Sequence, residues 1–61
     1  MKSDWRAVDV ATGKQVGNIW GSFIECQAEL LRSQYSGEVR YQARYQALTA
    51  ETEAGPWYDR C

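Results

Sequence analysis

The clearest pattern of hydrophobic and polar positions lies in residues 39–49. The odd positions from 39 to 47 carry valine, tyrosine or alanine, and the even positions between them carry only arginine or glutamine. Because successive side chains of a β-strand point to opposite faces, this alternation is typical of a strand with one buried and one polar face. The pattern predicts a strand whose polar face presents Arg40, Gln42 and Arg44.

A second helix from Glu38 to about Thr49 is the alternative for this segment. Tyrosine, glutamine and alanine recur there with a period of four, and Ala, Gln and Arg are good helix formers. A helix, however, would scatter the arginines and glutamines around its circumference. The unbroken alternation of odd and even positions therefore favours the strand.

Two shorter apolar segments near the N-terminus predict a β-hairpin. Residues 5–11 and 15–20 are rich in Trp, Val and Ile, and Thr12-Gly13 stands between them. Glycine accepts the positive φ that tight hairpin turns require. The apolar residues of 15–20 are not sorted cleanly onto one face, so the pattern predicts the strands but leaves their register open.

A helix is expected to follow the hairpin. Ser22 and Glu25 have the spacing of a capping box, in which each side chain accepts a hydrogen bond from the backbone N–H of the other residue. Residues 23–32 tolerate a helix well, and Gly37 supplies the residue for a left-handed C-terminal cap. The expected helix spans residues 22–36.

This helix carries two apolar stripes. The expectation is that Leu31 belongs to the core and that Glu25, Glu29 and Arg32 lie on the solvated side. Either both stripes form one wide surface facing the core, or one packs on the sheet and the other stays available to a partner. The first stripe contains Ile24, Ala28, Leu31 and Tyr35, and the second Phe23, Cys26 and Leu30.

Together these elements predict an α+β fold of β-β-α-β order, with one helix packed on a three-stranded antiparallel sheet. The domain is expected to span residues 1–50, and residues 51–61 read as a polar and aromatic C-terminal tail with a turn at Gly55-Pro56. Trp57 and Tyr58 are costly to leave in water. The tail therefore either folds back onto the domain or docks on another protein.

Length limits what such a chain can do. Sixty-one residues bury a core of about 3–5 kcal/mol, so partner binding or homodimerisation would add needed stability. Three Trp, four Tyr and one Phe are many for this length, and aromatic residues are favoured in interfaces as well as in cores.

The charge pattern disfavours non-specific binding to nucleic acid. The formal net charge is −1, and seven basic and eight acidic residues are dispersed along the chain. No apolar stretch approaches the ~20 residues that span a bilayer, and the first residues lack the apolar core of a signal peptide. The expectation is a cytosolic protein with no membrane partner.

Catalytic chemistry finds little support. The chain has no histidine, which removes the usual general base and zinc ligand. Cys26 has no histidine to activate it and reads as a small, partly buried thiol, and Cys61 reads as an incidental exposed one. The glycines match no phosphate-binding loop. We expect no enzyme, no cofactor and no metal.

Three segments carry a resemblance to a known class of proteins. They are Trp5-Arg-Ala-Val8, Ser22-Phe-Ile-Glu25 and Gln34-Tyr35-Ser-Gly37-Glu-Val39, ahead of arginines on the last strand. In this arrangement the chain resembles the short β-β-α-β inhibitors that bacteriophages encode against host enzymes, for example against bacterial RNA polymerase. The resemblance implies an accessory protein that occupies a surface of a host protein, and it implies no particular target.

The leading hypothesis is accordingly a non-enzymatic protein-binding module. Its expected partner-binding residues are Arg40, Gln42, Arg44, Trp57 and Tyr58, and Arg40 and Arg44 are expected to contact the partner without supporting the fold. The second hypothesis is a nucleic-acid-binding protein in which these arginines and Arg6 bind phosphates while Tyr or Trp stacks on bases.

Overall fold

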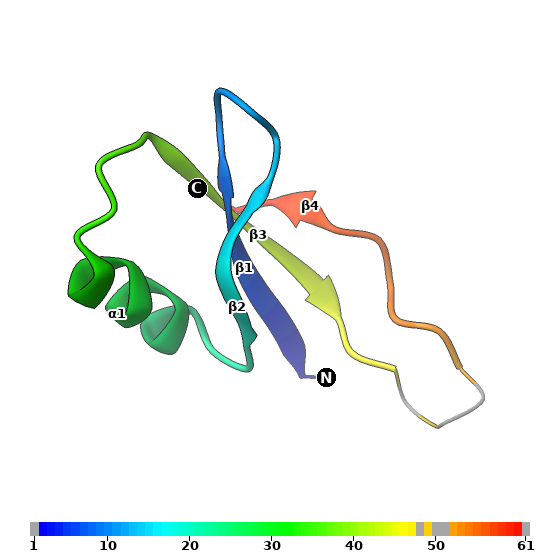
Figure 1. Cartoon of the computed structure of the whole chain (residues 1–61). Coiled ribbons are helices and arrows are strands. Elements are labelled where there is room, and N and C mark those ends of the chain that lie inside the picture. Colours follow the sequence, from blue (N-terminus) through cyan, green and yellow to red (C-terminus); the bar gives the residue numbers. More distant parts are fainter. Residues whose placement is uncertain (1, 48, 50–51, 61) are drawn as a thin grey trace.

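A computed structural model of the chain describes residues 2–47, 49 and 52–60. One helix lies against an antiparallel sheet with the strand order β2-β1-β3-β4 (Figure 1). The predicted α+β class is confirmed, and within the described residues the sheet has four strands where three were expected. The elements are β1 (Ser3–Asp9), β2 (Gln15–Trp20), α1 (Phe23–Ser33), β3 (Val39–Tyr45) and β4 (Tyr58–Asp59).

The predicted hairpin connects β1 to β2 through Gly13, which has a φ of 74°. The Asp9 side chain starts the turn, because its Oδ1 accepts hydrogen bonds from the backbone N–H groups of Ala11 at 2.8 Å and Thr12 at 3.2 Å. The N–H of Gly13 donates to the carbonyl of Asp9 at 2.8 Å, and the N–H of Asp9 donates to the carbonyl of Lys14 at 2.9 Å. The turn is thus formed by the short polar side chain of Asp9 together with the positive φ of Gly13.

A bulge in β2 explains why its apolar residues are not sorted by alternation. Trp20 pairs with Trp5 and Val16 pairs with Ala7, so three residues of β2 oppose one residue of β1. Gly17 lies in this bulge with a φ of 79°, a backbone conformation that side chains other than glycine rarely adopt. Val16 and Trp20 therefore both reach the helix side of the sheet.

The start of α1 follows the prediction and its end does not. Ser22 is the N-cap, and its Oγ accepts a hydrogen bond from the N–H of Glu25 at 3.3 Å. The helix ends at Ser33 rather than at residue 36, because Gln34 takes the left-handed conformation with a φ of 54° and its N–H bonds the carbonyls of Leu30 and Leu31. Gly37 is therefore not the cap.

Residues 39–45 form a strand, which excludes the alternative of a second helix. Its odd positions face α1, where Ala43 is buried and Val39 and Tyr41 are half-buried against the core, and its even positions carry Arg40, Gln42 and Arg44. The strand is shorter than predicted and ends at Tyr45. The alternation of this segment is thus confirmed as that of a strand with two unlike faces.

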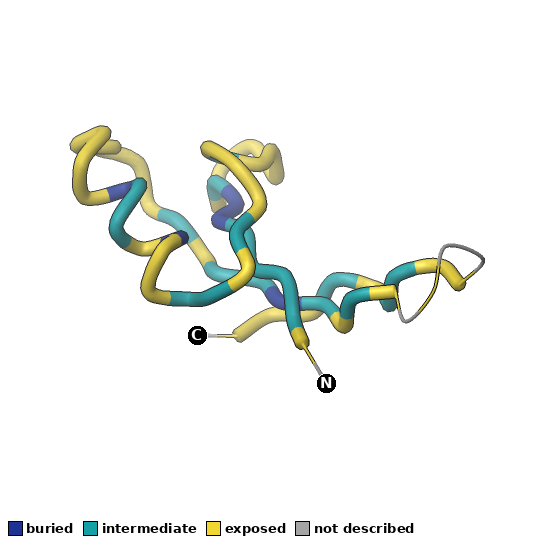
Figure 2. The backbone as a smooth tube through the Cα atoms, turned by 90° about the horizontal axis from the view of Figure 1, so that it is seen from below, coloured by how far each residue is buried: buried dark blue, intermediate teal, exposed yellow. Residues whose placement is uncertain are grey.

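The core lies between α1 and the centre of the sheet. Few positions are buried, and Figure 2 shows them on α1 and on the central strands, whereas the loops and most of α1 are exposed. The ring of Phe23 lies 5.2 Å from that of Trp5 and 4.9 Å from that of Tyr41, centroid to centroid, so three aromatic residues extend the core toward the helix N-terminus. Among the described residues, the buried ones are Ala7, Cys26, Leu30 and Ala43, together with Val8, which lies beside Arg40 on the other face of the sheet.

Cys26 is buried in this core rather than only partly so. Burial, and secondarily the Glu29 carboxylate, raise the pKa of its thiol. Cys61 lies outside the described residues.

Within the described part of the chain, no helix is long and apolar enough to cross a membrane.

Only one of the two apolar stripes of α1 packs on the sheet. Cys26 and Leu30 are buried there, whereas Ile24 is 76% exposed and Leu31 is 74% exposed. The expectation that Leu31 belongs to the core is therefore wrong. Tyr35 lies beyond the helix, and its hydroxyl donates a hydrogen bond to the Asp9 carboxylate.

Glu29 fixes this rotation of the helix. Its Oε1 accepts hydrogen bonds from the Asn18 N–H at 2.8 Å and from Trp20 Nε1 at 3.0 Å, and its Oε2 accepts one from Asn18 Nδ2 at 2.7 Å. A side chain at Gly17 would collide with this carboxylate. Glu29, expected on the solvated side, instead binds the bulged part of β2 to the helix.

Leu30 and Leu31 are adjacent residues of one type with opposite environments, which makes them a matched pair. Leu30→Ala removes a buried side chain and should lower the free energy of unfolding by about 2–5 kcal/mol. Leu31→Ala should change it by about 0.5 kcal/mol or less, because its side chain is mostly in water. Urea denaturation at low protein concentration measures both, and a larger loss for Leu31→Ala would contradict this rotation of the helix.

The Glu29 carboxylate should make stability depend on pH. The hydrogen bonds from Trp20 and from the Asn18 N–H lower its pKa from the ordinary value of 4.5, so the ionised form is the one that the fold favours. This stabilisation is present above the unfolded-state pKa and is lost as the pH falls through the folded-state pKa.

The test compares melting temperatures of wild type and Glu29→Gln between pH 7 and about pH 3, a range that spans the carboxylate pKa values. The melting temperature of wild type should exceed that of the variant at neutral pH, and the difference should shrink as the pH falls below the pKa of glutamate. Subtraction cancels the contributions of Asp9 and Asp59, whose pKa values are also lowered. A difference that is the same at all pH values would contradict this role of Glu29.

Candidate functional site

The sheet face opposite α1 is strongly polar. The register of β1 and β3 places residues of even number side by side, with Arg6 beside Gln42 and Val8 beside Arg40. On the other face, odd-numbered residues of both strands pack in the core, namely Trp5 and Ala7 of β1 and Val39 and Tyr41 of β3. The face therefore collects the arginines of two strands that lie far apart in the sequence.

Trp57 covers the middle of this face. Two guanidinium groups lie over its ring, with Cζ of Arg6 at 4.3 Å and Cζ of Arg44 at 4.5 Å from the ring centroid. Both distances are within the range of cation–π contacts. We call the surface formed by Arg6, Arg40, Gln42, Arg44 and Trp57 the arginine–tryptophan face.

The C-terminal segment brings Trp57 to this place by folding back along β3. The Gly55 N–H donates to the carbonyl of Tyr45 at 3.0 Å, and the Arg60 N–H donates to the carbonyl of Tyr41 at 2.8 Å. Between these two bonds β4 pairs with β3. Of the two alternatives for Trp57, the structure therefore has the one in which the segment folds back onto the domain.

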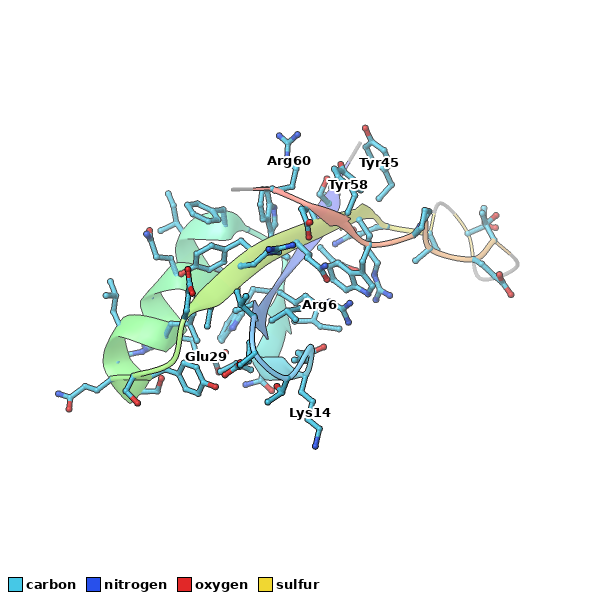
Figure 3. The ribbon with its side chains drawn as sticks, turned by 90° about the horizontal axis from the view of Figure 1, so that it is seen from above. Arg6, Lys14, Glu29, Tyr45, Tyr58 and Arg60 are labelled. Carbon is cyan, nitrogen blue, oxygen red and sulfur yellow. The ribbon has the colours of Figure 1, made fainter. Side chains whose placement is uncertain are left out.

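Tyr58 is directed away from the arginine–tryptophan face. It pairs with Ala43, and its ring lies 6.2 Å from the ring of Tyr45, centroid to centroid. Figure 3 shows Tyr45, Tyr58 and Arg60 on one side of the β3 ribbon and Arg6 on the other. The structure thus brings together four of the five predicted site residues and places Tyr58 apart from them.

Asp59 holds one end of the face. Its Oδ2 accepts a hydrogen bond from Arg40 Nη1 at 3.0 Å, and its Oδ1 accepts one from Gln42 Nε2 at 3.0 Å. The hydrogen bond from Gln42 contributes most to lowering the pKa of the Asp59 carboxyl, and the contacts with Arg40 lower it further. Gln42 in turn accepts a hydrogen bond through Oε1 from Arg6 Nε at 2.9 Å, so one amide joins three strands.

Asp4 holds the other end. Its Oδ2 pairs with Arg44 Nε at 3.3 Å, and its Oδ1 accepts a hydrogen bond from Gln46 Nε2 at 2.7 Å. Arg40 and Arg44 therefore bind residues of β4 and β1, and the expectation that they take no part in the fold is wrong. Their side chains stay partly exposed, at 48% for Arg40 and 28% for Arg44.

Arg6 is the cation of this face that has no acidic partner among the described residues. Its contacts are the hydrogen bond to Gln42 and the Trp57 ring. Burial, and secondarily the charge of Arg44, lower the pKa of Arg6, although a guanidinium stays protonated at neutral pH. The positive charge of Arg6 therefore remains available to an anionic group.

A groove of about 280 Å³ lies beside Arg6 and continues the face toward the hairpin turn. Val8 and Val10 contribute apolar surface to it, and Arg6, Arg40 and Gln42 contribute polar atoms. A larger concave region of about 470 Å³ lies elsewhere, lined by Trp5, Phe23, Asp59 and Arg60. The smaller groove is the one that joins the arginine–tryptophan face.

Sequence reasoning missed the carboxylates that arrange this face. Asp4 precedes Arg6 by two residues and Asp59 follows Trp57 by two, so alternation along each strand places both acids on the arginine side. That signal is present in the sequence for Asp4. For Asp59 it becomes readable only once the last residues are known to form a strand.

No group of three or more potential ligands that could hold a metal ion occurs in the described ranges 2–47, 49 and 52–60. The arginine–tryptophan face consists of three guanidinium groups, one amide and one indole ring. Comparison of the chain with protein-family models, with curated proteins and with solved structures finds no match.

Proposed function

We propose that this chain is a small, non-enzymatic protein-binding module that uses the arginine–tryptophan face to bind an acidic surface of another protein. The observation that carries the proposal is the packing of Trp57 against the guanidinium groups of both Arg6 and Arg44. Tryptophan and arginine are, with tyrosine, the residues most enriched among those that dominate the energy of protein interfaces.

The arrangement of the face supports binding because its side chains are already ordered. Arg44 is held by Asp4, Arg6 by Gln42, and both by the Trp57 ring. Side chains that are fixed before binding lose less conformational entropy when a partner arrives. A partner carboxylate can then pair with Arg6 without breaking an existing salt bridge.

The partner class follows from charge. The face carries three guanidinium groups against the carboxylates of Asp4 and Asp59, so an acidic patch is its electrostatic complement. The resemblance to phage-encoded inhibitors suggests a bacterial host protein as the partner, which makes the chain a phage or prophage accessory protein that inhibits or modulates its target.

Nucleic-acid binding is the second candidate, because a tryptophan among arginines can also stack on an unpaired base. Two observations weigh against it. The whole chain has a net charge of −1, and two of the three arginines of the face already pair with carboxylates, which phosphates would have to displace.

The protein-binding proposal is tested by reversing the unpaired charge. Tagged wild type, Arg6→Glu and Lys14→Glu are used to capture proteins from a bacterial lysate. Arg6→Glu should lose the specific partner, because reversing a charge within an interface costs about 2–5 kcal/mol. Lys14→Glu makes the same change in charge at the hairpin, where Lys14 points away from the domain (Figure 3), and should capture as wild type does.

Arg6→Gln serves as a neutral variant of the same position, and melting curves of all variants confirm that they are folded. A partner retained by both Arg6 variants would contradict the proposal. So would a partner lost equally from Lys14→Glu.

The two candidate functions differ in their dependence on salt. Binding through phosphate contacts weakens steeply as the salt concentration increases. We expect no such salt-sensitive binding when the chain is titrated with single- and double-stranded oligonucleotides at about 50 and 200 mM salt. Fluorescence anisotropy of labelled oligonucleotides makes the measurement. Salt-sensitive binding that Arg6→Glu abolishes would favour the nucleic-acid function instead.

A further inference from the structure

The outer side of α1 carries an apolar patch that the domain does not use. Ile24 and Leu31 are the most exposed large hydrophobic residues of the described chain, at 76% and 74%. They lie seven residues apart with Ala28 between them, so the three side chains form one stripe along two turns of the helix. Cys26 and Leu30, on the other side of α1, face the sheet.

Charged residues border this patch in a regular way. Glu25 lies in the first turn of α1 and Arg32 lies in the last, and their spacing of seven places both along the same edge of the stripe. Neither forms a salt bridge with a described residue. The other edge carries Gln27, which is exposed and uncharged.

This surface is complementary to itself when a two-fold axis, perpendicular to α1, passes beside the middle of the helix. In an antiparallel pair of such helices, Ile24 of each copy lies against Leu31 of the other, and the small Ala28 at the centre lets the helices approach closely. The same axis places Glu25 of each copy beside Arg32 of the other, so two ion pairs form between the copies. The macrodipoles of the two helices are then antiparallel as well.

We propose that the outer side of α1, formed by Ile24, Ala28 and Leu31 with Glu25 and Arg32 along its edge, binds a second copy of this chain as an antiparallel two-fold dimer. A parallel two-fold pair would place the edge that carries Glu25 and Arg32 beside the uncharged Gln27 edge of the other copy, where neither charge has a partner. The positions of Glu25 and Arg32 thus favour the antiparallel arrangement.

The contact is small, since α1 has only 11 residues, and the dimer is accordingly weak and dependent on concentration. It leaves the arginine–tryptophan face free, because that face lies on the opposite side of the sheet from α1. A dimer therefore presents two copies of the proposed binding face, and a partner with repeated acidic sites would be bound by both. The proposal of a dimer does not depend on the function proposed for that face.

Exchange of the charges tests the arrangement directly. Sedimentation velocity of wild type from about 10 µM to 1 mM should show a monomer that becomes a dimer. Glu25→Arg and Arg32→Glu should each weaken self-association about tenfold or more, because each brings like charges together at two places. An equimolar mixture of the two variants should recover association, since each edge charge of one variant then faces an opposite charge on the other. The double exchange within one chain should also self-associate as wild type does.

The apolar part of the patch is tested by Leu31→Asn with Val10→Asn as control. Both residues are exposed, but Val10 lies at the hairpin, so only Leu31→Asn should abolish the dimer. Melting curves at low concentration establish that each variant is folded. A wild type that stays monomeric throughout the range would overturn the proposal, as would a dimer that Leu31→Asn and the charge exchanges leave unchanged.

Discussion

The antiparallel pairing of β1 with β3 is the interaction on which the rest of the structure depends. It runs without a bulge from Ser3 opposite Tyr45 to Asp9 opposite Val39, and it joins segments that lie far apart in the sequence. Because both strands alternate in register, the pairing creates a helix-facing side of apolar residues and an opposite side of arginines at the same time. A shift by one residue would exchange the two faces, so the core and the candidate site are specified together.

The parts of the fold that could be predicted are those set by local patterns. Alternation in residues 39–45 identified β3, Ser22 identified the start of α1, and Gly13 identified the turn of the hairpin. The rotation of α1 could not be predicted, because both of its stripes are apolar. The rotation is set by Glu29, which accepts hydrogen bonds from Asn18 and Trp20 at a bulge in β2. No local sequence pattern predicts that bulge.

The candidate site could be predicted in its residues more than in its geometry. The alternation of β3 indicated Arg40, Gln42 and Arg44, and the aromatic pair near the C-terminus indicated Trp57. Where Trp57 lies depends on a chain reversal that the Gly55 N–H secures at Tyr45. Contacts between segments so far from each other in the sequence depend on the assembled sheet, and they determine that Trp57 joins the arginines while Tyr58 does not.

Fold and site share residues in this small domain to an unusual extent. Among the described residues only five are buried, all of them apolar, so the ordering of β4 depends on contacts at the polar face as well as on the core. Asp59 binds β3 through Arg40 and Gln42, and Trp57 packs on Arg6 and Arg44. Each of these contacts is partly solvated and individually weak, but they act on one short strand and reinforce each other. A partner that bound Arg6 and left the Arg40–Asp59 pair intact would therefore also stabilise the strand that follows Trp57, and by linkage the ordering of that strand and the affinity for the partner would increase together.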